Sequence, residues 1–513
     1  EYIILRQMQT ETGDILNRDQ LQGDLQQIFS LGLFEDVQVA LEPGQDPRKV
    51  VVNLNVQERK TGSFSAGAGF SSNSGIFGTG SYSQSNLFGR NYRLNAQAQV
   101  GTRDFLFDLG FTNPWIKGDP YRTSYTVNAF NRLTLPLVFD NGVLDDTTID
   151  DVQDQFRFSE TPGGTFVADP AGDRIGFSVD AQGNFLPDAT DPAEADDVLD
   201  DPPCGILNNP GSPGEACDVR LEDFDDDDNG NPVFDNLDTP RVNRLGAGIA
   251  FTRPFTKSND PRRRARAWVA SAGVRYERVS IRDSDLDLVP TDELGNPLSF
   301  SGVEQQRDGA AITRSQDDLF SVQFGIARDL RNDGLSPTKG NLLRAGVEQT
   351  LPFGAGSVAL TRLRASYSQF FPARIFKQEG PQTFAFNVQG GTIIGDLPPY
   401  EAFTLGGSNS VRGFRDGNVG SGRSFLQATA EYRFPLLKFL GGIGGVVFAD
   451  YGTLLGTDTD VPGQPSIIRG KPGDGFGFGG GVRVKTPIGP VRIDYAVNDD
   501  GDDRVHFGFG ERF

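Results

Sequence analysis

The stretch LQATAEYRF, residues 426–434, indicates the fold because it alternates strictly between two kinds of side chain. Leu, Ala, Ala, Tyr and Phe occupy one set of positions, and Gln, Thr, Glu and Arg occupy the other. Side chains point alternately to the two faces of a strand, so this period of two predicts a β-strand with an apolar and a polar face. Residues 105–112 and 362–368 alternate in the same way. Such strands suit a membrane β-barrel with a wet interior or a soluble β-sandwich.

The length and spacing of the strands favour the membrane barrel. From residue 62 onward about sixteen such strands follow one another, an even number as in bacterial barrels. Many have about ten residues, the length that crosses a bilayer. Short turns such as NLFGRN (86–91) alternate with long loops, among them residues 282–316 and 454–475. We therefore predict a mainly β fold: an antiparallel transmembrane β-barrel of about 16 strands over residues 60–513.

Residues 1–59 follow another pattern and predict a separate α+β domain. Leu21, Leu25 and Ile28 recur at helical spacing after Asn17, a suitable N-cap. Two alternating segments, 34–44 and 48–59, then flank a Pro-Gly turn. Because the domain starts abruptly on a helix-like stretch, we expect its first strand and any preceding domains to be missing. The absence of a signal peptide decides nothing.

The acidity of the chain is local. Its net charge is −21, and residues 134–241 alone hold 27 Asp and Glu against four Arg and no Lys. We expect this segment to be a long extracellular loop. The acidic balance argues against nucleic-acid binding, which needs a basic surface.

The two cysteines, Cys204 and Cys217, both lie in this acidic segment, and their even number and short spacing predict a disulfide. Asp225, Asp227 and Asn229 match the first half of a calcium loop, but Asn236 stands where such a loop carries Glu. A solvated acidic loop and a calcium site both fit this pattern.

Signals for enzymatic chemistry are weak. The chain holds a single histidine, His506, in the last predicted strand, where a Ser-His-Asp triad would have to assemble at the barrel seam. The run GFGFGGG (475–481) mimics a nucleotide loop, but no helix follows it, and its alternate glycines fit a strand with one face free of side chains. We expect neither an enzyme nor a protein that needs a cofactor.

Four segments carry a family resemblance. FSLGLFEDVQV (29–39) resembles the end of a POTRA domain, and VRGF (411–414) resembles the signature of the outer-membrane assembly and translocation family that includes BamA and TamA. FADYG (448–452) resembles the F-x-D-x-G strand motif of that family, and residues 479–496 resemble its penultimate strand pair. All four occur in the family's order, which makes the set far more specific than any one motif.

The resemblance implies that the sixth outer loop, residues 396–424, folds back into the barrel. There Arg412, flanked by Val411, Gly413 and Phe414, would meet Asp450 on the wall, with Asp494 as a second candidate partner. Phe448 and Gly452 complete the strand motif. A confined guanidinium makes short, charge-assisted contacts to carboxylates, and glycines allow close approach of the backbone. Such a lock could stabilise the loop or take part in transport.

The seam between first and last strands is rich in glycine. Gly67, Gly69, Gly508 and Gly510 add no cross-strand side-chain pairs, so this seam is expected either to open easily or merely to bend at a barrel corner. Phe513 resembles the aromatic C-terminal signal of barrels that this machinery assembles, and we expect it on one strand face with Phe507 and Phe509.

The function implied is ATP-independent folding and insertion of client β-barrels, with unfolded outer-membrane proteins and the lipid bilayer as partners. Periplasmic chaperones or accessory subunits are further candidate partners. The expected location is an outer membrane, bacterial or plastid-type, with the POTRA domain on the periplasmic side. A protein-conducting channel, as in two-partner secretion or plastid import, is the main alternative, and a passive porin is another.

Overall fold

A computed structural model describes most of the chain outside the acidic segment. It covers residues 2–139 and 240–513, apart from gaps at 47, 72–74, 103, 259–260, 284–285, 293–294, 355, 378–379, 438–442, 456–459, 469, 485–490 and 511, together with five strand pieces between 140 and 239. Within these residues, no helix combines the length and the apolar character that a membrane crossing requires.

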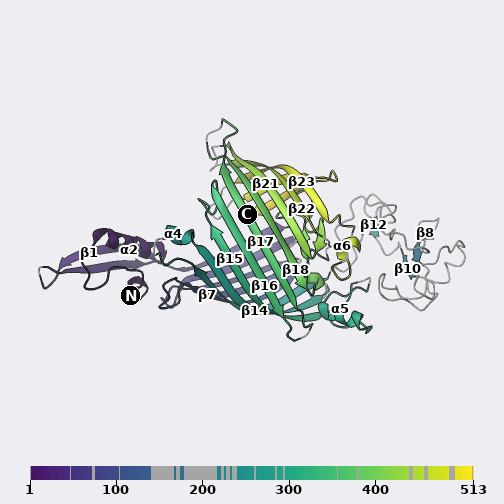
Figure 1. Ribbon diagram of the computed structural model, residues 1–513, viewed down its shortest axis with the longest axis horizontal. Helices are drawn as coiled ribbons and strands as arrows, with labels where there is room; N and C mark the ends of the chain where they lie inside the picture. Colours follow the sequence, from purple (N-terminus) through teal and green to yellow (C-terminus); the bar gives the residue numbers. More distant parts are fainter. Residues whose placement is uncertain are drawn as a thin grey trace. The chain divides into compact units, whose positions relative to one another are not determined.

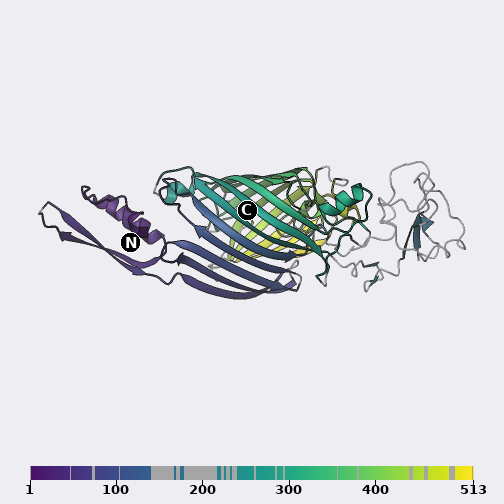
Figure 2. The same cartoon turned by 90° about the horizontal axis from the view of Figure 1, so that it is seen from below.

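The N-terminal domain packs helix α2 (Arg18–Ser30) against a hairpin of β1 (Phe34–Pro43) and β2 (Val50–Glu58), after a short α1 (Tyr2–Leu5) (Figure 2). Asn17 begins α2 as predicted, because its side-chain oxygen accepts hydrogen bonds from the backbone N–H groups of the first turn. The small apolar core gathers residues of helix and hairpin, namely Ile3, Ile28, Leu33 and Phe34.

Sixteen antiparallel strands form the main sheet, which confirms the predicted fold class (Figure 1). Their bounds are β3 (Gly62–Ser71), β4 (Gly75–Leu87), β5 (Tyr92–Gly101), β6 (Phe105–Asn113), β7 (Ser124–Thr134), β13 (Arg241–Pro254), β14 (Trp268–Arg282), β15 (Gln316–Asp329), β16 (Gly340–Leu351), β17 (Leu360–Pro372), β18 (Thr383–Gly395), β21 (Ser424–Leu437), β22 (Ile443–Thr453), β23 (Asp474–Val484), β24 (Val491–Asn498) and β25 (Asp503–Phe509). Each strand pairs with its neighbours in chain order, and β3 and β25 stand at the two ends of that order.

The alternation in the sequence corresponds to two different faces. Apolar side chains of successive strands, such as Phe107, Leu363, Val388 and Leu426, are about two-fifths exposed or more. Their polar neighbours point to the other face, where Gln427, for example, is buried. One face therefore presents apolar side chains outward, as a membrane barrel requires, while the opposite face is polar and is covered where the sixth loop packs on it.

Shorter elements lie in the connections. They are β8 (Val167–Ala168), β9 (Arg174–Phe177), β10 (Cys217–Arg220), β11 (Asp225–Asp226), β12 (Pro232–Val233), α4 (Pro261–Ala265), α5 (Phe300–Arg307), η4 (Pro399–Glu401), β19 (Phe403–Leu405), β20 (Gly420–Gly422) and α6 (Pro465–Ile468). Three of these, η4, β19 and β20, belong to the connection between β18 and β21, which is the predicted sixth loop.

The prediction for the end of the chain is wrong in one respect. The last strand was expected to run to Phe513, but β25 ends at Phe509, and Gly510 has a positive φ of 80° that turns the backbone. Phe513 consequently does not continue the strand face with Phe507. Its ring stacks on the ring of Phe370 in β17, with centroids 6.1 Å apart, and faces the guanidinium of Arg433 at 5.2 Å.

Candidate functional site

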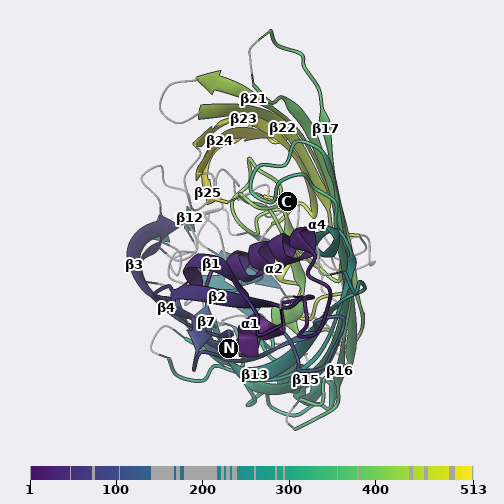
Figure 3. The ribbon, with the colours of Figure 1, turned by 90° about the vertical axis from the view of Figure 1, so that its left-hand side faces the viewer.

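The sixth loop is folded against the polar face of strands β21 to β25, whose curve Figure 3 shows from one end. Its two arms pair as a small antiparallel ladder, β19 with β20. Between the arms the chain turns at Gly406, Gly407 and Gly413, all with φ between 96° and 113°, a region that residues with a Cβ rarely adopt. The glycines of the stretch therefore let the loop double back and carry residue 412 to the sheet.

Arg412 is fully buried and contacts three carboxylates from three strands. Its Nε and Nη2 donate to the two oxygens of Asp450 on β22 (2.7 and 3.0 Å), and its backbone N–H donates to the same group at 3.2 Å. Nη1 donates to Asp494 on β24 at 3.1 Å, and Nη2 lies 3.0 Å from Glu431 on β21. This bidentate, fork-like pairing is the geometry that guanidinium favours. We call Arg412 with these three acids the Arg412 cluster.

Apolar contacts surround the cluster. The guanidinium of Arg412 lies over the ring of Phe448, 3.3 Å from its centroid, a cation–π arrangement in a site shielded from water. Val411 and Phe414 are buried in one apolar group with Leu405, Val419 and Leu454. These two apolar residues, which flank Arg412 in the sequence, thus anchor the loop beside the charge.

The glycines of β22 and β23 make room for the loop. A Cβ on Gly477 would collide with the carbonyl oxygen of Arg412, and one on Gly475 would lie 2.7 Å from the ring of Phe414. A Cβ on Gly452, from the strand motif, would lie 2.7 Å from the Val411 side chain. The alternate glycines of β23 therefore form a face free of side chains, and the sixth loop packs directly on it.

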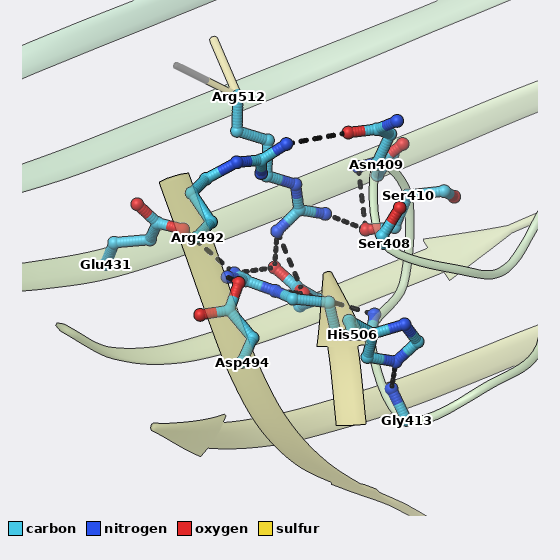
Figure 4. Close-up of polar contacts among 12 residues, drawn as sticks. Ser408, Asn409, Ser410, Gly413, Glu431, Arg492, Asp494, His506 and Arg512 are labelled. Atoms are coloured by element: carbon cyan, nitrogen blue, oxygen red, sulfur yellow. Dashed lines mark hydrogen bonds and ion pairs between the residues drawn. The ribbon is translucent and has the colours of Figure 1, made fainter. Parts of the chain in front are cut away.

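Several residues of the site were missed by the sequence interpretation. Arg512, in the segment after β25, donates to both oxygens of Asp450 at 2.9 and 3.0 Å, and it also reaches the carbonyl of Ser410 (Figure 4). Arg483 on β23 pairs with Asp494, and Arg433 pairs with Glu431 at 2.8 Å. Each carboxylate is thus shared by Arg412 and a second arginine.

His506 lies on β25 beside the signature. Its Nε2 accepts a hydrogen bond from the backbone N–H of Gly413 at 3.0 Å, as Figure 4 shows. The ring must be unprotonated on this nitrogen to accept. The single histidine of the chain therefore binds the loop backbone one residue from Arg412, and the only sequence signal for this was its place in the last strand.

A second buried cluster holds the first arm of the loop. Glu401, at the end of η4, accepts from Arg244 of β13 at 2.6 Å and pairs with Arg362 of β17. Glu277 lies 3.1 Å from Arg244, and Glu348 lies 3.2 Å from Arg362. We call these five residues the Glu401 cluster. Its members come from five distant parts of the sequence, so no local motif announced it.

Tyr400 extends this second attachment to α5. Its hydroxyl donates to Asp317 at 2.7 Å, and the same carboxylate accepts from the backbone N–H groups of Phe300 and Ser301 at the first turn of α5. A carboxylate at a helix N-terminus satisfies donors that have no partner within the helix. The buried Asp317 thus ties α5, β15 and the sixth loop together.

The remaining predicted residues do not join this site. Gly67 and Gly69 lie in β3 and Gly508 in β25, the strands at the ends of the sheet order, while Gly510 follows β25. Easy opening of this seam stays a prediction. Cys204 lies outside the described residues, and so does the predicted disulfide with Cys217. Asp227 and Asn229 of the calcium pattern are also outside them, whereas Asp225 begins β11. The described part of the chain holds no group of three or more potential metal ligands.

The fold and the site together define a class: an outer-membrane β-barrel protein with an N-terminal POTRA domain and a sixth loop attached to the inner, polar face of its sheet. The model of the Omp85 superfamily domain matches residues 86–170 and 214–513, and a POTRA model, described as surface antigen variable number repeat, matches residues 1–59. The chain belongs to the Omp85 superfamily.

Relatives and solved structures agree with this assignment. Outer envelope protein 80 of Arabidopsis thaliana chloroplasts is 30% identical over 99% of this chain and 53% of its own length. The TOC75 protein of Pisum sativum chloroplasts is 28% identical over 55% of this chain and 34% of its own length. The crystal structure of BamA from Haemophilus ducreyi lacking POTRA domains 1–3 has a TM-score of 0.63 at 15% identity, covering 99% of this chain and 81% of that one, and thus shares the fold.

The chain spans about half the length of the curated relatives that it matches throughout. It covers 53% of outer envelope protein 80 of Arabidopsis thaliana and 59% of that of Oryza sativa. Members of the superfamily act in β-barrel insertion or protein translocation at outer membranes, as transporters or assembly factors. The chain is accordingly an outer-membrane or plastid outer-envelope protein of this transport family.

Proposed function

We propose that this protein folds and inserts client β-barrels into the outer membrane without ATP. In this proposal the edge of the POTRA hairpin receives an unfolded client strand, and the seam between β3 and β25 passes the strand into the bilayer. A strand edge exposes unpaired backbone N–H and C=O groups, which template an added strand. The clients, and any chaperones or accessory subunits, belong to the same proposal.

The Arg412 cluster is the observation that carries the proposal. It fastens the sixth loop to β21, β22 and β24, and His506 extends the attachment to β25. The strands next to one end of the sheet order are therefore braced from within by a loop. Such bracing would keep them ordered while β25 exchanges partners at its outer edge. In this proposal the seam opens at the free edge of β25, while the pairing of β21 to β24 stays intact.

A reversible cross-link of the seam tests the proposal. In a chain with Cys204 and Cys217 replaced by Ser, a panel of cysteine pairs would join residue 64 or 66 of β3 to residue 505 or 507 of β25, all on the outward, apolar face. We expect oxidised pairs to abolish insertion of a client barrel into liposomes and reduction to restore it. The matched control is Tyr367→Cys with Val388→Cys, which face each other on β17 and β18 and should leave insertion unchanged when oxidised.

Equal insertion by oxidised and reduced seam variants would contradict the proposal. Single-channel recording then separates the remaining candidates, a protein-conducting channel and a passive porin. A conductance that a translocating polypeptide blocks would favour the channel, whereas a large, steady conductance insensitive to peptide would favour the porin.

A further inference from the structure

A strongly basic surface covers three connections at one end of strands β4 to β7, β13 and β14. Because successive strands are antiparallel, the connections 88–91, 114–123 and 255–267 lie at the same end as the link from the POTRA domain to β3. Together they contain eight Arg and Lys and only two Asp, which leaves a net charge of +6. Figure 1 shows α4, within the third connection, beyond one end of the strands.

Trp115, in the β6–β7 connection, contacts two cations, one of them from the POTRA domain. The guanidinium of Arg122 is 4.2 Å from the centre of the indole, and that of Arg6, from the POTRA domain, is 4.6 Å away. The indole N–H donates to the carbonyl of Asp119 at 2.7 Å, which fixes the ring in place. Two cations are thus held close together by one aromatic ring.

Tyr121 repeats the arrangement six residues further on. Arg253 lies 4.1 Å and Lys257 5.3 Å from the centre of its ring. Asp119 lies 3.8 Å from Arg253. Two aromatic side chains of one connection, Trp115 and Tyr121, are thus each in contact with two cations.

The charges interact across the connections. Burial is the main cause that lowers the pKa of Arg122 to about 10, and the positive charges of Arg264 on α4 and of Arg6 lower it further. The POTRA domain, the β6–β7 connection and α4 thus bring three guanidinium groups into one field. A bound anion would offset their mutual repulsion and stabilise the contact of Arg6 with Trp115.

Large apolar side chains in the same connections are exposed. Phe88 in the first connection is 83% exposed, and Phe255 in the third is 57% exposed. Aromatic rings next to Arg and Lys, at the ends of strands long enough to cross a bilayer, match the boundary between acyl chains and headgroups. Binding of an acidic polypeptide would explain the positive charge, but it would not explain the exposed aromatic rings at the ends of the strands.

We propose that this surface binds the phosphate groups of anionic phospholipids in the leaflet on the POTRA side. Arg122, Arg264 and the exposed Arg263 and Arg266 would contact the phosphates, while Phe88 and Phe255 would enter the adjoining acyl region. Basic clusters at a membrane surface attract anionic lipids in this way. The site is independent of the seam and would enrich such lipids around the β6–β7 and β13–β14 connections.

Fluorescence quenching of Trp115 tests the proposal in the full chain. The protein has only two tryptophans, so Trp268→Phe leaves Trp115 as the single reporter. In nanodiscs of phosphatidylcholine with a tenth of brominated phosphatidylglycerol, we expect quenching that corresponds to about fivefold local enrichment of the anionic lipid. Changing Arg263, Arg264 and Arg266 together to Gln should reduce the quenching to that of the bulk mole fraction, and so should about 0.5 M salt, because it screens surface charge.

The control variant removes three charges from the POTRA domain, by changing Arg18, Arg48 and Lys49 to Gln, and should keep the enrichment. Heat-modifiable migration on gels checks that every variant is folded. Quenching by the parent in proportion to mole fraction, or equal loss in the control, would overturn the proposal.

Inorganic phosphate at millimolar concentration distinguishes the source of the phosphate group. Unchanged enrichment supports the lipid headgroup, and displacement supports a site for free phosphate. Displacement by a stoichiometric acidic peptide would overturn it in favour of a polypeptide partner.

Discussion

The two clusters that hold the sixth loop use opposite charges. In the Arg412 cluster the loop supplies one cation, and strands β21, β22 and β24 supply three carboxylates. In the Glu401 cluster the loop supplies one carboxylate, and β13 and β17 supply two guanidinium groups. The first arm of the loop and the turn between its arms thus carry opposite charges, and each meets partners of the opposite sign in its own part of the sheet.

The difference shows how a long loop obtains a single position. A buried charge without a partner is costly. If Arg412 and Glu401 exchanged positions, Arg412 would lie beside the guanidinium groups of Arg244 and Arg362. Glu401 would then lie beside the three carboxylates of the Arg412 cluster. Opposite polarity therefore fixes the direction of the loop as well as its depth. The Arg412 cluster also has an apolar anchor beside it, since Val411 and Phe414 are buried together in one apolar group. It should accordingly be the stronger attachment.

Arg412→Ala should give the largest effect. The change removes the cation shared by three buried carboxylates, and breaking such a pair costs about 3 kcal/mol or more. Since cleavage of an opened loop follows its free energy of opening, protease cutting between residues 406 and 422 should become about a hundredfold faster, while the barrel stays in the membrane. Asn418→Ala, in the same loop, is the control and should change cutting little. Unchanged cutting in Arg412→Ala would refute the attachment.

A double-mutant cycle sharpens this result. Asp450→Asn alone should also loosen the loop, but the double variant Arg412→Ala with Asp450→Asn should cut hardly faster than Arg412→Ala. Residues that act through one contact are not additive, and a coupling of about 1–3 kcal/mol is expected. Additive effects would mean that Arg412 holds the loop through its other partners.

Glu401→Gln should have the second-largest effect. Arg244 and Arg362 would lose their shared carboxylate but keep Glu277 and Glu348, so we expect a cost of about 2 kcal/mol. Cutting should increase about thirtyfold at residues 396–405 and stay slow at 406–422. Equal cutting of both segments would show that the two clusters open as one unit and do not hold the loop independently.

Acid should release the Glu401 end only at very low pH. Burial by itself would raise the pKa of Glu401, but the positive charges of Arg244 and Arg362 outweigh it and lower the pKa to about 2. A carboxyl group with a depressed pKa stabilises the folded state above its unfolded value near 4.5, and this contribution is lost as the pH falls toward 2. Pepsin digestion should therefore find residues 396–405 protected at pH 5 and cut near pH 2. Cutting at pH 5 would contradict the ion pairs.

Gly477→Ala tests the packing beside the Arg412 cluster. The added Cβ would meet the carbonyl oxygen of Arg412, and overpacking of this kind costs about 1–3 kcal/mol. We expect about tenfold faster cutting at 406–422. Gly480→Ala on the same strand is the control, because its Cβ would make an ordinary contact of 3.4 Å with the carbonyl of Val446. Equal effects of the two changes would indicate a general loss of strand stability.

The sequence predicts features that depend on neighbouring residues, and it does not predict contacts between residues far apart in the chain. The alternation of apolar and polar residues predicted the sixteen strands, because successive side chains of a strand point to opposite faces of the sheet. The contact of Arg412 with Asp450 was expected from family motifs rather than from spacing. The Glu401 cluster joins residues up to 157 positions apart, and only the closure of strands in space brings them together. The turn at Gly510 was missed because Phe513 keeps the spacing of Phe507 and Phe509, with Glu511 between them, whereas the positive φ of Gly510 ends the strand.

His506→Leu should give the smallest effect and shows how much β25 contributes to the Arg412 side. The change removes the acceptor for the Gly413 N–H, and a single neutral hydrogen bond is worth about 1 kcal/mol. Cutting at 406–422 should become about fivefold faster, with residues 396–405 unaffected. His506→Gln, whose amide oxygen can still accept, should restore much of the protection. Because this bond is the direct link from the loop to the last strand, an effect as large as that of Arg412→Ala would mean that β25, rather than β21, β22 and β24, holds the loop in place.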